Sequence, residues 1–395
     1  MDELFLFLLI PGAVLLLWSL ILLAEILSAR DELKSRNCKI PRPEKLSSYV
    51  VLIPAHDESP TIVKAITALK RLMTAKGRIL VVADNCTDDT AQLARRCGAS
   101  VAERHDNTKL GKGYALDFGL QILQSAPPEV VIILDADSAF STGTPADLAG
   151  LALKQRMPVQ AYSGMRVFGG ESLSERIRHF AWRLKNYLRP LGLKNLDLPC
   201  QLAGSGMAFP WEMISSVNLA SSNLVEDIEM GINLATISAY PNFCADICVV
   251  SQFPKSKGGM QSQRERWEHG HLQIIFSRVP ALIVRSIRKF DRRLFAMALD
   301  LSVPPISLLV ILNFVYTAIG FAAGVFLSQT APVYLALLSC ATLASAISVA
   351  WMLCARDLIS PSELSRAALH PATKLALYTR FITKRQREWV RTARK

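Results

Sequence analysis

Short apolar runs alternate with helical segments from Ser48 onward. The strand-like runs are rich in β-branched and aliphatic residues and cover residues 49–53, 78–83, 100–103 and 130–134. Between them, apolar residues recur at helical spacing over residues 61–74, again in a helix that ends before Gly98, and over residues 112–124. This alternation predicts an α/β fold with a mostly parallel sheet flanked by helices.

Polar residues follow these strands at the points where the strands end. Residues 54–58 follow the first strand, residues 84–90 the second, and Asp135 and Asp137 the fourth. In open α/β sheets, ligands bind outside the carboxyl ends of the strands, so the pattern predicts a nucleotide-sized crevice there. Two carboxylates at this edge suit a divalent cation that neutralises a diphosphate, although an Asp-x-Asp sequence can also simply begin a polar turn. A dinucleotide fingerprint is excluded, because no third glycine follows Gly111 and Gly113 at the required spacing.

Three further apolar runs are long enough to cross a bilayer, over residues 4–27, 303–327 and 331–354. A secretory signal is a poor reading of the first run, because Met1-Asp2-Glu3 is acidic and no small-residue cleavage site follows. Buried core helices are the alternative for the other two. We expect one N-terminal and two C-terminal transmembrane helices.

Basic residues gather beside these runs in a chain of 395 residues with a formal net charge of +12. After the first run come Arg30, Lys34, Arg36, Lys39, Arg42 and Lys45, and the tail holds Lys374, Arg380, Lys384, Arg385, Arg387, Arg391, Arg394 and Lys395. The link at residues 328–330 has no charge. The positive-inside rule therefore predicts a cytoplasmic middle region and C-terminus, and we expect the inner or plasma membrane of a bacterium. Contact with anionic membrane lipids explains the charge, and no ordered aromatic and basic surface supports nucleic acid as a partner.

Two amphipathic segments, residues 172–193 and 278–294, combine an apolar face with arginines and lysines. Each could be an ordinary surface helix, but beside membrane spans we expect interfacial amphipathic helices. The eight cysteines are scattered, which fits a reducing compartment and gives no paired zinc motif.

Seven short motifs jointly resemble the membrane-bound family-two glycosyltransferases. They are Pro54-Ala55-His56-Asp57-Glu58, Asp84-Asn85-Cys86-Thr87-Asp88-Asp89, Lys112-Gly113-Tyr114-Ala115-Leu116, Asp135-Ala136-Asp137, Gly204-Ser205-Gly206, Glu226-Asp227 and Gln263-Arg264-Glu265-Arg266-Trp267. These inverting GT-A enzymes are related to the cellulose, chitin and hyaluronan synthases and to ceramide-type lipid glycosyltransferases. The resemblance covers roughly residues 48–290, and the ordered set is far more specific than any single motif.

The resemblance implies a donor site for a UDP-sugar. Asp135 and Asp137 would hold Mg or Mn, with Asp135 also on the nucleotide-sugar side. The resemblance assigns Asp84, with the backbone around Ala55 and Glu58, to uridine. Lys112 would approach the phosphates as a point charge.

The resemblance also implies the acceptor side. Asp227, the second carboxylate of the Glu-Asp motif, would be the base, with Glu226 and Glu229 as rivals whose orientation the sequence leaves open. Arg266 would pair with the departing diphosphate, because guanidinium binds phosphate bidentately. Trp267 would form a platform for the acceptor sugar, and Gln263 would help to close the site.

The spacing of His269 and His271 also admits a metal site, but nearby ligands are lacking, so hydrogen bonding to structure or acceptor is the preferred role. An interfacial segment would account for Arg266 and Trp267 separately, although not for the complete spacing.

The expected organisation has five parts. They are an anchor at 1–28, a cytoplasmic GT-A domain at 29–277, an interfacial region at 278–302, a transmembrane hairpin at 303–355 and a basic cytoplasmic tail at 356–395. Processive synthases have more spans, so polysaccharide export would need a homo-oligomer or an export partner. The enzyme would therefore extend a polysaccharide or add one sugar to a membrane lipid. A nucleotide-sugar-binding scaffold without turnover is the non-enzymatic alternative.

Overall fold

The computed structural model describes residues 2–34, 46–253, 256–367 and 370–383. The chain divides into two compact units. Among the described residues, the sheet unit comprises residues 46–166 and 199–270, and the helical unit comprises residues 2–34, 167–198 and 271–383. Each unit is described by itself.

The sheet unit contains an eight-stranded sheet with the order β3-β2-β1-β4-β7-β6-β8-β5. Its strands are β1 Tyr49–Ala55, β2 Gly77–Asp84, β3 Ser100–Arg104, β4 Val130–Ile133, β5 Ala139–Thr142, β6 Val159–Met165, β7 Met207–Pro210 and β8 Asn242–Ser251. Strands β3, β2, β1 and β4 are mutually parallel, as is the β6–β8 pair, whereas β7 runs antiparallel to β4 and β6, and β5 to β8. The predicted α/β fold with a mostly parallel sheet is confirmed.

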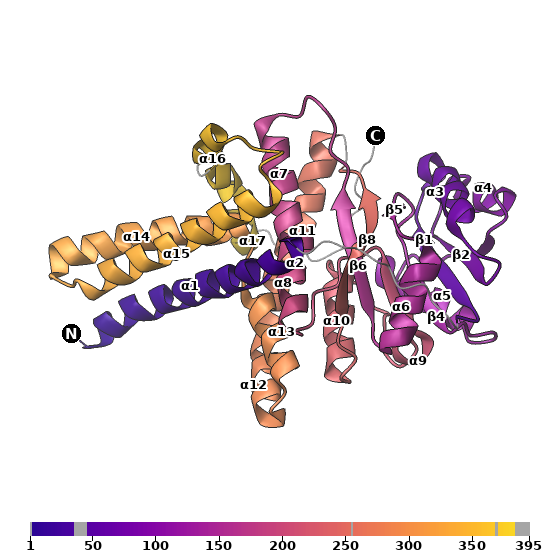
Figure 1. Ribbon diagram of the computed structural model, residues 1–395, viewed down its shortest axis with the longest axis horizontal. Coiled ribbons are helices and arrows are strands. Elements are labelled where there is room, and N and C mark those ends of the chain that lie inside the picture. The colour runs from indigo at the N-terminus through magenta and orange to yellow at the C-terminus, as the bar shows by residue number, and fades with distance from the viewer. Residues whose placement is uncertain (1, 35–45, 254–255, 368–369, 384–395) are drawn as a thin grey trace. The chain divides into compact units, whose positions relative to one another are not determined.

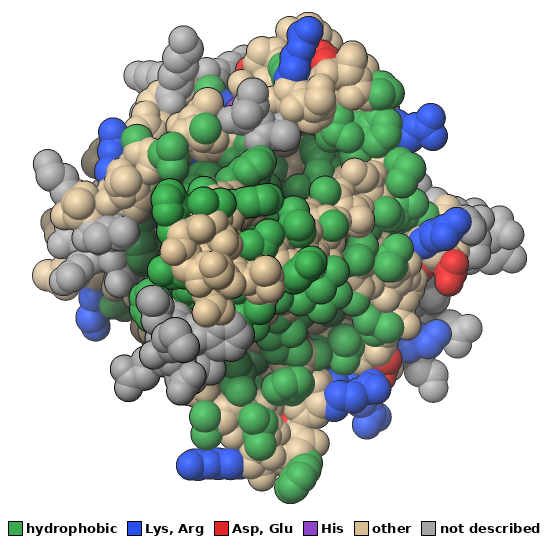
Figure 2. All heavy atoms as spheres, turned by 90° about the vertical axis from the view of Figure 1, so that its left-hand side faces the viewer, with side chains coloured by type: hydrophobic (Ala, Val, Ile, Leu, Met, Phe, Trp, Pro, Cys, Tyr) green, Lys and Arg blue, Asp and Glu red, His purple; other side chains and the backbone are tan. Residues whose placement is uncertain are grey.

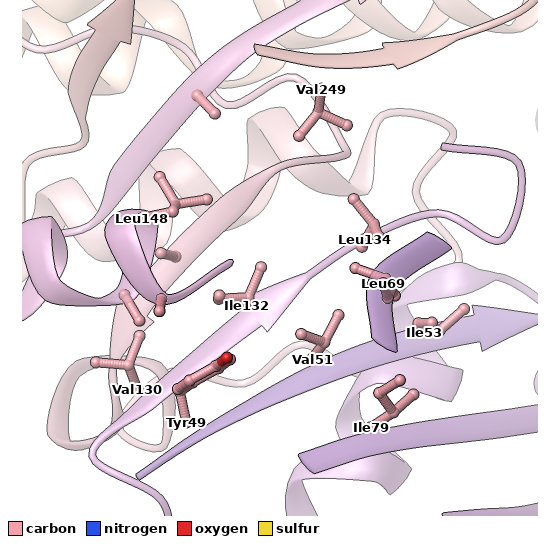
Figure 3. Close-up of a cluster of buried hydrophobic side chains, with 14 of the residues drawn as sticks. Tyr49, Val51, Ile53, Leu69, Ile79, Val130, Ile132, Leu134, Leu148 and Val249 are labelled. Atoms are coloured by element: carbon pink, nitrogen blue, oxygen red, sulfur yellow. The ribbon is translucent and has the colours of Figure 1, made fainter. Parts of the chain in front are cut away.

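Helices cover both faces of this sheet, which explains why its first strands are continuous apolar runs. The helices of the unit are α3 Ser59–Leu72, α4 Thr90–Arg96, α5 Lys112–Leu123, α6 Pro145–Gln155, α9 Trp211–Ile214 and α10 Glu226–Thr236. Alternate strand residues enter two cores. Val51 and Ile53 pack with α3, α4 and α6 on one face (Figure 3), and Val50 and Leu52 pack with α5, α9 and α10 on the other. Helix α11 Lys257–Ser277 begins in the sheet unit and ends in the helical unit.

Three long helices, α1 Asp2–Ser28, α14 Ile306–Leu327 and α15 Ala331–Cys354, lie side by side in the helical unit (Figure 1). They are long and apolar enough to cross a membrane. Close packing and a few polar contacts join them: Tyr316 Oη donates to the Leu8 carbonyl at 3.0 Å, and Ser339 Oγ donates to Asn313 Oδ1 at 2.6 Å. Such contacts are typical of helices that associate in lipid.

Large apolar side chains on these helices face outward. Phe7 is 73% exposed, Val325 74% and Phe326 82%. Figure 2 looks onto the end where α1 begins and α14 connects to α15, and hydrophobic side chains gather over the middle of that face. Exposure of these gathered apolar side chains to water would be unfavourable, so an apolar environment is expected around them.

The predicted helix over residues 172–193 is divided into α7 Leu173–Arg183, a π-helical turn η1 Leu184–Leu188 and α8 Arg189–Asn195. Its apolar residues Phe180, Leu184 and Leu188 are buried in the helical unit, where these segments contact α1 and α15. Protein covers part of this face, and its position at the bilayer interface stays a prediction.

The predicted helix over residues 278–294 is also wrong as a single element. Helix α12 Val279–Lys289 ends at Phe290, whose φ of 52° is left-handed, and α13 Arg292–Ser302 begins after Asp291, whose side chain accepts from the Leu294 N–H at 2.9 Å. An apolar surface nevertheless remains on α12, where Ile287 is 60% exposed, and the adjoining Phe290 is 96% exposed. Within the helical unit, α12 runs across the direction of α1, α14 and α15 (Figure 1).

Four shorter elements complete the helical unit: α2 Arg30–Lys34, α16 Pro361–Ala367, the 3-10 turn η2 His370–Lys374 and α17 Leu375–Thr383. Several residues of the predicted basic clusters lie outside the described residues, namely Arg36, Lys39, Arg42, Lys45, Lys384, Arg385, Arg387, Arg391, Arg394 and Lys395. No disulfide joins the cysteines that the structure describes.

Candidate active site

Asp84 ends β2 at the carboxyl edge of the sheet, one residue beyond the point where Ala83 pairs with Ala55 of β1. The Arg104 Nη1 donates to Asp84 Oδ1 at 2.6 Å, and His56 Nδ1 donates to the Asp84 carbonyl at 2.7 Å. Burial raises the pKa of the Asp84 carboxyl, even though Arg104 acts in the opposite direction. The predicted uridine residue is therefore a buried, ion-paired carboxylate that is held in one orientation.

Arg104 is a residue of this site that the sequence did not single out. It ends β3 and pairs in register with Asp84. Its guanidinium also donates to the Lys109 carbonyl at 2.9 Å and lies 5.6 Å from the centroid of the Tyr114 ring. The sequence contains one signal for this residue, an arginine directly after the third predicted strand. The predicted strand ends at Glu103, whereas β3 includes Arg104.

The backbone around Ala55 and Glu58 is tied to the segment that follows β2. The Cys86 Sγ donates to the Ala55 carbonyl at 3.4 Å, and the Glu58 N–H donates to Thr90 Oγ1 at 2.8 Å. The structure thus brings the predicted residues of the first two strand tips together.

Asp135 and Asp137 follow β4, and both side chains are partly exposed. The Asp135 N–H donates to Ser205 Oγ at 3.1 Å, which fixes the start of this turn. Two adjacent carboxylates with access to solvent are hard oxygen ligands of the kind that Mg²⁺ and Mn²⁺ prefer. The pair therefore fits a divalent cation.

Lys112 is the residue that connects the donor edge to the rest of the site. It begins α5 after Gly111, whose φ is 130°. Its Nζ donates to Asp135 Oδ1 at 2.5 Å and to the Gly204 carbonyl at 2.6 Å, and lies 3.8 Å from Glu226 Oε1. Burial by itself would lower the pKa of this ammonium group, but the carboxylates of Asp135 and Glu226 raise it. Lys112 is consequently a charged bridge between three structural elements.

The Gly204-Ser205-Gly206 turn places its backbone against Asp227. Gly204 and Gly206 have φ values of 81° and 70°, which favour glycine. A Cβ atom at Gly204 would lie 3.3 Å from Asp227 Oδ2. The buried Gln160 supports the turn by donating from Nε2 to the Ser205 carbonyl at 3.0 Å. No sequence motif had pointed to Gln160.

Glu226 and Asp227 occupy the first turn of α10, where the positive end of the helix dipole favours carboxylates. Burial raises the pKa of Glu226, and Asp227 adds to the effect, although Lys112 and Arg266 oppose it. Asp227 Oδ1 accepts the Ile228 N–H at 2.9 Å. Both carboxylates thus lie near Lys112. Together with Lys112 and Asp135 they form a group of charged side chains, called the Lys112 cluster below.

The third acidic candidate, Glu229, has a different neighbour. Its Oε2 accepts from Asn223 Nδ2 at 3.4 Å. This contact orients Glu229 toward the segment before α10. Glu226 is therefore a better alternative than Glu229 to Asp227 as the catalytic base.

Arg266 on α11 lies close enough to Glu226 to lower its pKa. Its Nε atom is buried and has no hydrogen-bond partner among the described residues. A guanidinium with an unused donor beside this cluster suits an incoming anion. Gln263 and Trp267 lie on the same helix and are partly buried.

One of the two histidines of α11 forms a hydrogen bond within the helical unit. His271 is buried, and its Nε2 donates to the Leu301 carbonyl at 3.0 Å within the helical unit. Burial lowers the pKa of His271 to about 3, so the ring is neutral. Because Nε2 carries the donated hydrogen, the role of His271 is structural.

Asp57, Cys86 and Asp88 form another group with metal-binding side chains. However, Asp57 Oδ1 accepts the Thr87 N–H at 2.6 Å, and Asp88 Oδ2 accepts the Ser59 N–H at 3.1 Å. Burial raises the pKa of Cys86 to about 11, which keeps the thiol protonated and makes it a poor ligand. These side chains organise the loops between β1, β2 and their helices.

Comparisons with known proteins agree with this architecture. The profile of "Glycosyl transferase family 2" matches residues 50–209, and that of "Glycosyl transferase family group 2" matches residues 130–353. No protein of curated function matches the chain.

Two solved structures are similar to the chain at low sequence identity. The mannosyltransferase PcManGT from Pyrobaculum calidifontis, in complex with GDP-Man and Mn²⁺, is 16% identical with a TM-score of 0.50, over 85% of this chain and 99% of that one. Glucosyl-3-phosphoglycerate synthase from Mycobacterium tuberculosis is 20% identical with a TM-score of 0.37, over 57% of this chain and 78% of that one. Because the family group 2 profile matches more than half of its length, the chain belongs to glycosyl transferase family group 2 and is a glycosyltransferase with a GT-A-type fold.

Proposed function

We propose that the chain is an integral-membrane, inverting glycosyltransferase that moves a sugar from a UDP-sugar to a growing polysaccharide or a lipid-linked acceptor. The observation that carries the proposal is the Lys112 cluster. One ammonium group joins Asp135 at the donor edge to Glu226 at the start of α10, beside Asp227. Donor and acceptor functions therefore meet at one point of the sheet unit.

On the donor side, Asp84, paired with Arg104, would bind the base together with the backbone at Ala55 and Glu58. Asp135 and Asp137 would hold Mg²⁺ or Mn²⁺. When bound, the cation supplies positive charge that neutralises the diphosphate.

On the acceptor side, Asp227 accepts the proton of the attacking hydroxyl group. The hydroxyl oxygen bonds to the anomeric carbon as the bond to the diphosphate breaks, so the configuration inverts. Arg266 and Lys112 stabilise the negative charge of the departing UDP. Trp267 and Gln263 would position the acceptor sugar. Glu226 remains the alternative base.

The membrane role rests on α1, α14 and α15, which are long and apolar enough to span a bilayer. We retain the division predicted from the sequence, with the catalytic domain at residues 29–277 in the cytoplasm and a basic tail at 356–395. Helix α12 would lie at the interface, because Ile287 is exposed and Arg285, Arg288 and Lys289 can contact anionic lipid.

Two acceptor classes follow from the small number of spans. Three helices do not by themselves enclose a polar conduit, so polysaccharide export requires self-association or an export partner. Transfer of a single sugar to a membrane lipid such as a ceramide or diacylglycerol requires neither. The exposed apolar surface of α12 favours a lipid acceptor.

The experiment offers membranes containing the full chain a panel of UDP-sugars, with GDP-mannose for comparison, in Mg²⁺ or Mn²⁺ and cellular lipid extract. Released nucleotide and the mass of the product are measured, with membranes containing the Asp227→Asn variant as the matched control. A ladder of products indicates polymerisation, and one lipid-soluble product indicates single transfer. Absence of nucleotide release with every donor contradicts the proposal. If no donor releases nucleotide but the Asp227→Asn variant still binds a donor, the chain is a nucleotide-sugar-binding scaffold.

A further inference from the structure

The Lys112 amino group forms a hydrogen bond with a carboxylate oxygen that the proposed metal site needs as a ligand. Its Nζ donates to Asp135 Oδ1 at 2.5 Å. The two side chains are only 17% and 34% exposed, respectively, so water screens the contact less than it would at the surface. A divalent cation that approaches Asp135 meets a positive charge already in contact with its ligand.

The same ammonium group has other partners that do not depend on Asp135. It donates to the Gly204 carbonyl at 2.6 Å and lies 3.8 Å from Glu226 Oε1. Lys112 can therefore release Asp135 and remain in the site. A diphosphate would replace the lost contact with a stronger one, because its oxygens are charged acceptors.

We propose that Lys112 makes binding of the divalent cation depend on binding of the nucleotide diphosphate. Without nucleotide, Lys112 acts as the counter-ion of Asp135 and weakens cation binding. With nucleotide, the diphosphate attracts the ammonium group and exposes Asp135 Oδ1. Lys112 is thus a positioning residue that couples the two ligands. The inference rests on the proposed function, since it takes Asp135 as a ligand of the cation.

The test measures Mn²⁺ binding by the loss of the free-ion signal in electron paramagnetic resonance. Purified full-length protein in detergent is titrated alone, with UDP and with GDP. We expect UDP to tighten Mn²⁺ binding about tenfold or more in the unmodified protein, within the usual range of coupling between sites. In Lys112→Met, Mn²⁺ should bind more tightly without nucleotide, and the effect of UDP should become smaller, because only the direct attraction between the diphosphate and the cation remains.

Four further variants make the result specific. Lys112→Arg keeps the charge and should retain the full coupling, whereas Lys112→Gln should reduce it and replaces Lys112→Met if that variant does not fold. Lys154→Met removes the same charge from an exposed position on α6 and should behave like the unmodified protein. Asp135→Asn should abolish the coupled Mn²⁺ site.

The outcomes separate the inference from the proposed function. Equal coupling in the unmodified protein and in Lys112→Met or Lys112→Gln overturns the inference and leaves the function intact. Absence of Mn²⁺ binding to the unmodified protein with either nucleotide overturns the metal part of the function and the inference together. By linkage, UDP affinity must show the same coupling factor when Mn²⁺ is varied.

Discussion

Arg189 Nε donates to Glu25 Oε2 at 2.5 Å and so joins α8 to the apolar helix α1. Its Nη2 donates to Asp300 Oδ1 on α13, also at 2.5 Å. All three side chains are buried. Burial alone would lower the pKa of Arg189. The two carboxylates have the larger effect, so the pKa lies above its ordinary value. Charges removed from water in this way are tolerated only while they remain paired.

Arg189→Met should strongly destabilise the helical unit, because it leaves two buried carboxylates without their cation. The expected loss is about 3–5 kcal/mol of unfolding free energy. Arg293→Met is the matched control, since Arg293 pairs with Asp197, whose side chain is 76% exposed, and should cost less than about 1 kcal/mol. Thermal unfolding in detergent measures both, and equal melting temperatures for the two variants would show that the buried network contributes little.

Asp227→Asn should reduce kcat by about 10²–10⁴-fold, because the acceptor hydroxyl loses its base. The variant should still bind UDP, since the donor side is unchanged. Glu226→Gln should lose less, and Glu229→Gln least, because Glu229 is drawn toward Asn223. Rates of nucleotide release at saturating donor provide the measurement. A greater loss in Glu226→Gln than in Asp227→Asn would reverse the assignment of the base.

Glu226 should make stability depend on pH. Its folded-state pKa is raised, so its favourable contribution is complete below the ordinary glutamate pKa of about 4.3 and is lost as pH rises through the raised value. Glu226→Gln removes this dependence. The melting temperature of the variant minus that of the unmodified protein should therefore increase from pH 4 upward and then level off. A difference that stays constant or decreases over this range would contradict the raised pKa of Glu226.

Asp135→Asn and Asp137→Asn should each lower metal-stimulated transfer by about tenfold or more, because one hard oxygen ligand is weakened. Treatment of the unmodified protein with EDTA should abolish transfer, and added Mn²⁺ or Mg²⁺ should restore it. Asp89→Asn is the control, since Asp89 is exposed and makes no side-chain cap bond to α4. Full activity of the unmodified protein in EDTA would exclude a metal requirement.

Arg104→Met should weaken UDP binding about tenfold or more, because loss of a charge-assisted hydrogen bond is worth about 1.5–3 kcal/mol and frees Asp84 to reorient. Arg95→Met is the matched control. Arg95 pairs with Glu103 at a position where the arginine side chain is 51% exposed. Calorimetry with UDP measures both affinities. If Arg95→Met weakens binding as much as Arg104→Met, general charge explains the effect.

Local patterns predicted much of the fold. The apolar runs that became β1 to β4 and the three long helices carry signals that depend only on neighbouring residues. The break between α12 and α13 does not, because an aromatic residue such as Phe290 seldom adopts a positive φ. The π-helical turn at Leu184–Leu188 likewise has no local signature.

The site was less predictable than the fold for a similar reason. Motifs placed Asp84, Asp135 and Asp227 at suitable ends of elements, but the groups that lie against them come from distant parts of the chain. The Arg104–Asp84 pair depends on the register of β2 with β3, and the support by Gln160 depends on where β6 lies beside β7. Which carboxylate of the Glu226-Asp227 pair lies nearer to Lys112 also depends on packing that a helical period does not contain.

Lys112 also limits how this enzyme can be re-engineered. Its amino group contacts groups that follow β4, precede β7 and begin α10, although all three lie far from it in the chain. A chimera could take the strands and helices of the nucleotide-binding half from another glycosyltransferase and keep α10 of this chain. The lysine and aspartate of one protein would then face the Glu226 carboxylate of the other, without the contacts seen here. Transplants that move α5, the Gly204 turn and the first turn of α10 together should therefore outperform those that exchange the nucleotide-binding half alone.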